Sequence, residues 1–135
     1  MTTPTAELRR GCPTRELLDR VGDKWSTLLL LVLAAEEVQR TSALRRALPD
    51  LSAKVLTQTL RGLEQDGLVE RTIRSVSPPH VEYRLTPLGF SLVEALGVLT
   101  SWAEDHIGEM RDARARATPA AAPWLEPRPY TAEVA

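Results

Sequence analysis

The chain has 135 residues, of which 43% are hydrophobic and 26% are charged, and this composition indicates one globular domain rather than a disordered or fibrous chain. A single cysteine, Cys12, excludes an intramolecular disulfide framework. No apolar run approaches the ~20 residues of a membrane helix, and residues 1–5 do not begin a signal peptide. We therefore expect a cytoplasmic protein with no membrane partner.

The charge varies along the chain, although the formal net charge is only −1. Residues 38–86 carry eight Lys or Arg against five Asp or Glu, whereas residues 87–135 carry four against seven. A basic middle followed by an acidic C-terminal part favours a DNA-facing module joined to a segment that does not touch DNA.

Two helices are predicted at the start of the ordered chain. The first begins at Pro13 or Thr14, and its inward-facing residues are expected to be Leu17, Leu18 and Val21. The second is capped by Asp23 and runs to about Ala35. It is apolar nearly all round, which is typical of a helix at the centre of a domain. Its Trp25 is interpreted as a core anchor in preference to a ligand contact.

The basic middle predicts a helix-turn-helix. A short strand over residues 38–40 precedes a short helix, Ala43–Leu48, which Thr41 or Ser42 can cap. A tight turn then leads to a second, longer helix. Two helices of this length joined by such a turn are the arrangement found in many DNA-binding proteins.

The second helix of the pair can be capped by Ser52 and ended by Gly67 in a left-handed conformation. One of its faces is an apolar stripe made of Leu56, Leu60 and Leu63. Another face combines cations, a hydroxyl and an amide with no carboxylate: Lys54, Thr57, Gln58 and Arg61. Phosphate oxygens and base edges in a major groove require such groups, which predicts a recognition helix. Gln58 suits adenine and Arg61 suits guanine or phosphate, while Ser52 can also bind a phosphate.

A β-hairpin is predicted directly after this helix. Residues 68–74 and 81–85 alternate between apolar and polar, and the loop between them contains two prolines. The hairpin corresponds to the wing of a winged helix. Its expected phosphate or minor-groove contacts are Arg71, Arg74, His80 and Arg84.

A long final helix is predicted from Pro87, with Thr86 as its N-cap, to about Arg116. Its apolar surface exceeds what one small domain can cover, so we expect a second copy of the chain as its partner. The residues expected at this dimer interface are Leu92, Leu96, Leu99, Trp102 and Ala103. The alternative is a helix that folds back onto its own domain.

Together these stretches resemble the HxlR-type family of bacterial winged-helix transcriptional regulators, which is related to the MarR group. The resemblance covers about residues 12–107, in the order and spacing of the family. It rests on Cys12-Pro13, Val21–Trp25, Leu48–Ser52 with Leu56–Gln58 and Leu63–Val69, and Pro78–Gly89. It implies a homodimer joined through its first and last helices that binds a pseudo-palindromic operator.

The expected fold is therefore mainly α with a small β-hairpin wing: a winged helix-turn-helix with a long C-terminal dimerisation helix. The domain is predicted over residues 12–117. A flexible N-terminal arm over residues 1–11 and a Pro/Ala-rich tail over residues 118–135 are expected to flank it.

Cys12 matches the position at which some members of this family sense oxidants or electrophiles. A helix N-terminus favours the thiolate, and Arg9, Arg10 and Arg15 are close to Cys12 in sequence. Because the chain has no second cysteine, oxidation would proceed to an intermolecular disulfide or to capping by a small thiol. The alternative is a small buried hydrophobic residue without a signalling role.

The favoured function is a homodimeric DNA-binding transcriptional regulator, most simply a repressor, with Cys12 as its candidate redox sensor. A small molecule stacked on Trp25 and Trp102 is an alternative signal. A winged-helix protein–protein adaptor is the rival class, favoured by the weak net charge. His80, His106 and one cysteine do not form a metal site, and the chain has no phosphate loop or nucleophile motif. We therefore expect no metal, no cofactor and no enzyme activity.

Overall fold

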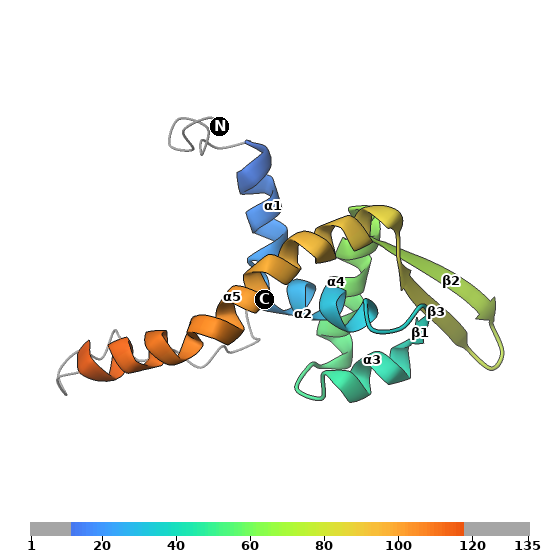
Figure 1. Cartoon of the computed structure of the whole chain (residues 1–135). Coiled ribbons are helices and arrows are strands. Elements are labelled where there is room, and N and C mark those ends of the chain that lie inside the picture. Colours follow the sequence, from blue (N-terminus) through green and yellow to red (C-terminus); the bar gives the residue numbers. More distant parts are fainter. Residues whose placement is uncertain (1–11, 118–135) are drawn as a thin grey trace. The chain divides into compact units, whose positions relative to one another are not determined.

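The computed structural model describes residues 12–117 and confirms the predicted fold class (Figure 1). The contacts divide the chain into two units after Leu96. The predicted arm and tail lie outside the described residues. Among the helices at positions 12–117, none is long and apolar enough to cross a membrane. In chain order the elements are α1 (Pro13–Val21), α2 (Lys24–Leu33), β1 (Gln39–Arg40), α3 (Thr41–Ala47), α4 (Ala53–Gln65), β2 (Val69–Ser75), β3 (His80–Leu85) and α5 (Pro87–Ala117).

The predicted start of α2 is confirmed. The Asp23 carboxylate accepts hydrogen bonds from the backbone N–H groups of Trp25 and Ser26, and it also accepts one from the Ser26 hydroxyl at 2.7 Å. The helix ends at Leu33, slightly earlier than expected. The buried Gln39 amide donates to the Val32 carbonyl at 2.6 Å. The residue that begins β1 therefore supplies a hydrogen-bond donor to a carbonyl group in the last turn of α2.

The prediction that Thr41 or Ser42 caps α3 is wrong. α3 begins at Thr41, and the cap position belongs to Arg40, which makes no side-chain capping bond. Arg40 is extended and pairs with Glu82 of β3. The chain therefore passes directly from a sheet strand into the helix and leaves no separate capping residue.

Both predicted ends of α4 are confirmed. The Ser52 hydroxyl accepts from the Val55 N–H at 3.2 Å. At the other end, Gly67 has a φ of +74°. Its N–H donates to the Glu64 carbonyl, and the Leu68 N–H donates to the Leu63 carbonyl, each at 3.0 Å. These two hydrogen bonds form the Schellman motif, which requires a residue in the left-handed conformation at the position of Gly67.

The predicted wing is present as β2 and β3, and β1 adds a third antiparallel strand in the order β1-β3-β2. Thr86 then connects the sheet to the helices: its hydroxyl donates to the Gly67 carbonyl at 2.6 Å and accepts from the Gly89 N–H at 3.0 Å. A Cβ on Gly89 would overlap the Leu68 carbonyl. The first turn of α5 is therefore packed closely against the end of α4.

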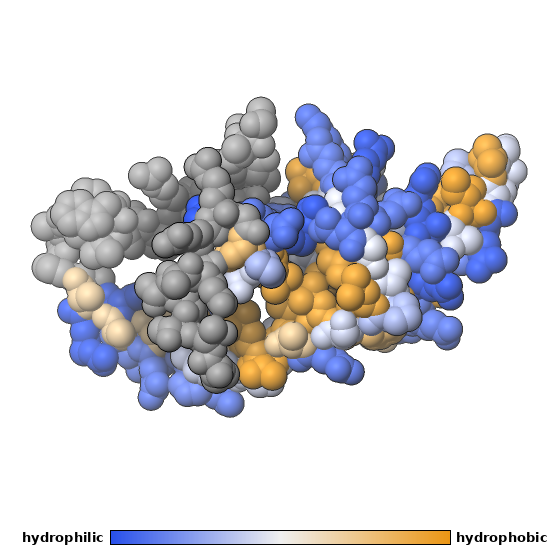
Figure 2. Space-filling model, turned by 90° about the horizontal axis from the view of Figure 1, so that it is seen from above, coloured by the Kyte–Doolittle hydropathy of each residue, from blue (hydrophilic) through white to orange (hydrophobic). Residues whose placement is uncertain are grey.

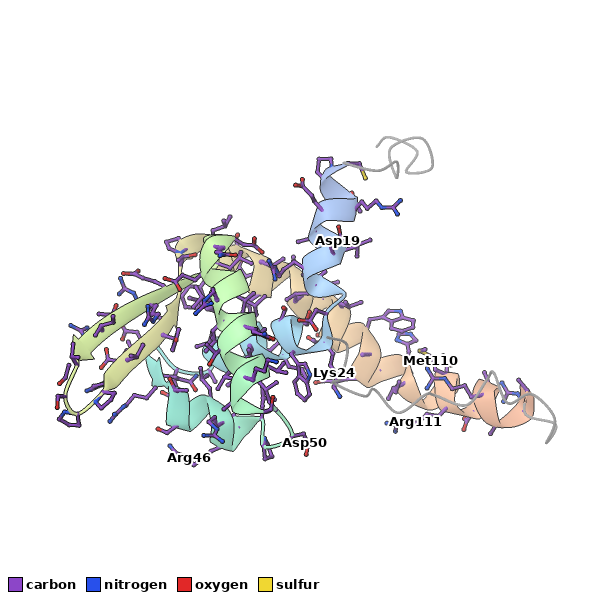
Figure 3. The ribbon with its side chains drawn as sticks, turned by 180° about the vertical axis from the view of Figure 1, so that it is seen from behind. Asp19, Lys24, Arg46, Asp50, Met110 and Arg111 are labelled. Carbon is purple, nitrogen blue, oxygen red and sulfur yellow. The ribbon has the colours of Figure 1, made fainter. Side chains whose placement is uncertain are left out.

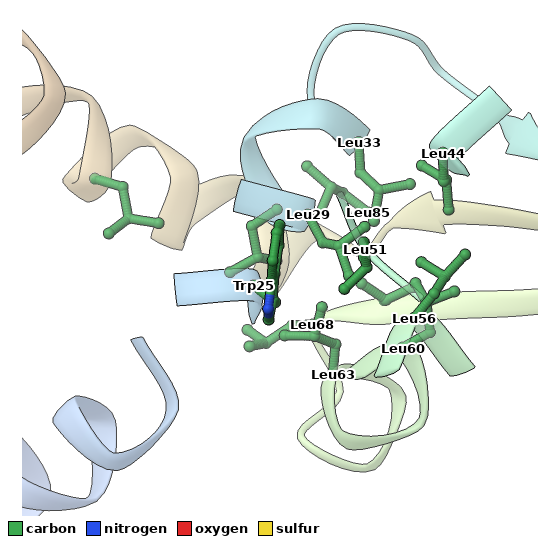
Figure 4. Close-up of a cluster of buried hydrophobic side chains, with 13 residues drawn as sticks. Trp25, Leu29, Leu33, Leu44, Leu51, Leu56, Leu60, Leu63, Leu68 and Leu85 are labelled. Carbon is green, nitrogen blue, oxygen red and sulfur yellow. The ribbon is translucent and has the colours of Figure 1, made fainter. Parts of the chain in front are cut away.

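The core lies among α2, α3, α4, the base of the wing and the first part of α5 (Figure 4). Trp25 belongs to it and is 6% exposed. The side chains that are fully buried include Leu29, Leu30, Leu33, Leu44, Leu56 and Leu63. α1 contributes none: Leu17 is 44% exposed and Leu18 is 54% exposed, so the inward orientation expected for them is wrong. α1 packs mainly on α2, and residues 13–19 are exposed.

Candidate nucleic-acid interface

The polar face of α4 is exposed because the opposite face is fixed in the core. Leu56, Leu60 and Leu63 are at most 2% exposed. Lys54, Thr57, Gln58 and Arg61 are all exposed. The Thr57 hydroxyl donates to the Ala53 carbonyl at 2.9 Å and keeps its acceptor sites open. Within residues 12–117, Lys54 and Arg61 form no ion pair.

α3 adds cations that were not among the DNA contacts predicted from the sequence. Arg45 and Arg46 are exposed, and Figure 3 shows Arg46 directed away from the helix bundle. Arg40, at the junction of β1 and α3, is also exposed. The spacing of Leu44 and Leu48 already placed Arg45 and Arg46 on the outer face of the helix. In helix-turn-helix proteins the first helix crosses the DNA backbone, where such cations meet phosphates.

The wing pairs most of its cations internally. Arg74 and His80 both contact Glu82, each at 2.9 Å, while Arg84 binds Glu70 at 2.9 Å. The hydrogen bond from Arg74 holds the pKa of the Glu82 carboxyl below its ordinary value. Within the described chain, Arg71 is the only one of the four predicted wing contacts without a carboxylate partner. It is therefore the wing cation most available to a phosphate.

The predicted dimer residues fall into two environments. Leu96 is 6% exposed and lies in the core, and Leu92 packs against that core. Leu96 was expected to face a partner, but it faces the chain's own core. It shares a helical stripe with Gly89 and Val93, which face the same core. In the second unit, Leu99 is 61% exposed, whereas Ala103 is half-buried.

The two tryptophans proposed as ligand contacts are not equivalent. Trp25 is enclosed in the core, so its ring is not available to stack on a ligand at the surface. Trp102 is 49% exposed, and its ring stacks on His106 with centroids 4.6 Å apart. No group of metal-binding side chains occurs at positions 12–117.

A groove of about 560 Å³ lies in the first unit between α1, the end of α4 and the beginning of α5. Its apolar wall includes Leu17, Leu88, Leu92 and Ala95, and its polar end includes Arg20 and Asp66. Figure 2 shows apolar residues, in orange, exposed among charged ones on one face of the molecule.

Cys12 occupies the cap position of α1. Its Sγ accepts a hydrogen bond from the Arg15 N–H at 3.3 Å. The side chain is half-buried and the thiol is free. The candidate sensor therefore supports the first turn of the helix that carries the exposed Leu17 and Leu18.

A helix-turn-helix with an exposed basic face, followed by a wing, defines a winged-helix DNA-binding regulator. The HxlR-like helix-turn-helix family model matches residues 20–111. The chain belongs to this family of transcriptional regulators.

Individual relatives agree with this assignment. The HTH-type transcriptional regulator YtfH of Escherichia coli is 45% identical over 107 residues, which cover 77% of this chain and 84% of YtfH. The solved structure of the transcriptional regulator ytfH from Salmonella typhimurium is similar with a TM-score of 0.71 and 39% identity, covering 79% of this chain and 95% of that one. The redox regulator HypR in its reduced form has a TM-score of 0.69 and 32% identity, covering 74% and 98% of the two chains.

Proposed function

We propose that the protein is a homodimeric repressor that binds a pseudo-palindromic operator through one α4 in each of two successive major grooves. The observation that carries this proposal is the exposed face of α4 formed by Lys54, Thr57, Gln58 and Arg61, none of which carries a carboxylate. On this face Gln58 reads a base, while Arg61 contacts guanine or phosphate and Lys54 contacts phosphate. Arg71 extends the phosphate contacts to the wing.

Exposed apolar side chains support the homodimer. α1 has no buried residue, and Leu17 and Leu18 are exposed on it. In the second unit Leu99 and Trp102 are exposed on a helix that should otherwise be polar on its solvent side. A second copy that covers these residues would also supply the second recognition helix, which lies ~34 Å from the first on a two-half-site operator.

Selection from a random pool of double-stranded DNA tests the proposal. The wild-type protein is expected to enrich one sequence with two related half-sites and to bind it as two protomers. Leu99→Glu is expected to yield a monomer with much weaker operator binding, because it places a charge in the proposed interface. Ser101→Glu, which adds the same charge at an exposed polar position, is the matched control. If the wild-type protein enriches no sequence, the protein–protein adaptor becomes the better explanation.

We further propose that oxidation of Cys12 controls operator binding. The similarity to the redox regulator HypR, which has also been solved in an oxidised form, supports this role. Two Cys12 thiols from two protomers would join in a disulfide, while the oxidant takes up two electrons and two protons. The bond would act on α1, since Cys12 caps that helix.

Comparison of the wild-type protein with Cys12→Ser, each with and without diamide, tests this role. Serine can still cap α1, so the variant removes the thiol while it preserves the helix start. Diamide should change the operator affinity of the wild-type protein and leave that of Cys12→Ser unchanged. An equal response of both proteins would exclude Cys12 as the sensor.

A further inference from the structure

α1 has one ionic link to the recognition helix. Arg20, in the last turn of α1, donates from its Nε to the carboxylate of Asp66, the residue at the C-cap of α4. The two residues are 46 positions apart in the sequence. Within residues 12–117, Arg20 is the only α1 side chain that pairs with a residue of another helix.

The same guanidinium also lies against the backbone of α4. A Cβ built on Gly62 would lie 2.5 Å from Nη1 of Arg20 and 3.1 Å from its Cζ. Gly62 and Asp66 are one helical turn apart on the same face of α4. Arg20 therefore contacts α4 at two points, and the glycine leaves the space that the planar guanidinium needs.

α1 has few other contacts that could hold it in place against α4. No α1 residue is buried, and the packing of α1 is mainly on α2. The Arg20 and Asp66 side chains are 32% and 39% exposed, so water screens the pair only in part. A small displacement of α1 is therefore expected to shift α4 as well, because Arg20 joins the two helices.

We propose that Arg20 is a positioning residue that fixes α1 relative to the recognition helix and thereby sets the separation of the two recognition helices in the dimer. The proposal rests on the proposed function, since it requires α1 to lie at the dimer interface. Arg20 makes no contact with DNA in this account. It determines which half-site spacing the dimer accepts, because the dimer geometry reaches α4 through α1.

Three variants disturb the link in different ways. Arg20→Ala removes the guanidinium, and Asp66→Asn removes its anionic partner. Gly62→Ala keeps both charges but places a methyl group where the guanidinium lies, and alanine favours the helix, so folding is preserved. The matched control is Glu64→Gln, which removes one exposed negative charge from the same end of α4. Within the described residues, Glu64 forms no ion pair.

The measurement is the affinity of each protein for DNA that the wild-type protein selects, with the half-sites at the selected spacing and at one or two base pairs more or fewer. A single half-site serves as the reference. Loss of one partly exposed ion pair should lower the affinity roughly threefold for each protomer. Because the dimer contains two such pairs, each link variant should lose about tenfold in affinity at the selected spacing. Its dependence on spacing should flatten, while its affinity for the single half-site stays that of the wild-type protein.

Arg20→Lys keeps the charge but not the planar fork, and it should restore part of the spacing preference. A general loss of stability would lower the affinity for the single half-site as well. The proposal is overturned if the link variants keep the wild-type spacing profile, or if Glu64→Gln flattens it equally. If the wild-type protein selects no DNA, the proposed function fails and this inference fails with it.

Discussion

Arg71 and Arg84 lie on the two paired strands of the wing, and the structure predicts different roles for them. Arg71 is exposed and has no carboxylate partner within the described chain. Arg84 donates from Nε and Nη2 to the same Glu70 oxygen at 3.1 and 2.9 Å. An arginine already neutralised in this way displaces fewer counterions from DNA than a free one. We therefore expect Arg71→Ala to change the salt dependence of operator binding and Arg84→Ala to change it much less.

The expected size follows from counterion release. Each phosphate contact contributes about 0.9 to the slope of log affinity against log salt, and a homodimer loses two contacts with Arg71→Ala, so the slope should fall by roughly 1.8. Between 50 and 200 mM salt the wild-type protein should then lose about tenfold more affinity than the variant. Fluorescence anisotropy titrations on the selected operator at four salt concentrations measure the slope. Equal slopes for Arg71→Ala and Arg84→Ala would refute the distinction between the free and the paired cation.

Two further predictions concern stability. Gly89→Ala should lower the free energy of unfolding by about 1–3 kcal/mol in thermal or denaturant unfolding, because its Cβ meets a backbone carbonyl that cannot move aside. Gly108→Ala, in the same helix with nothing within 4 Å of its Cβ, should instead raise the free energy by up to about 1 kcal/mol, and a similar loss in both variants would contradict this reasoning. The hydrogen bond from Arg74 lowers the pKa of Glu82 in the folded protein from its ordinary value of 4.5. The pair therefore stabilises the fold at pH values above 4.5, and this stabilisation is lost as the pH falls through the lowered pKa of the folded state. Glu82→Gln should therefore make the unfolding midpoint less dependent on pH on the acid side, and an unchanged acid dependence would show that the pair is not formed in solution.

The sequence predicted the helices and strands where local chemistry decides them. Asp23, Ser52 and Thr86 begin helices because their side chains accept from nearby backbone N–H groups, and these bonds depend only on local spacing. Gly67 ends α4 for a similarly local reason. Apolar spacing likewise identified which face of α4 enters the core and which face stays exposed.

Long-range contacts were not predictable in the same way. The predicted cap of α3, Thr41 or Ser42, was wrong because β1 pairs with β3, and this contact joins segments that are distant in the sequence. The paired wing cations depend on the register of β2 and β3, in which Glu70 faces Arg84. The Arg20–Asp66 link joins residues from two helices whose packing cannot be read from spacing alone. The exposure of Leu17 is a further case, because apolar spacing does not say whether a helix face meets the chain's own core or another molecule.

The affinity of Lys54→Ala and Arg61→Ala for the selected operator at physiological salt tests most directly whether α4 binds DNA. Arg111→Ala, which removes an exposed cation from α5, is the matched control. Lys54→Ala should weaken binding to all DNA and lower the salt slope, while Arg61→Ala should weaken operator binding by about tenfold or more if it reads a guanine. All three variants should unfold at the wild-type temperature. Wild-type affinity in both α4 variants would show that this face does not bind DNA.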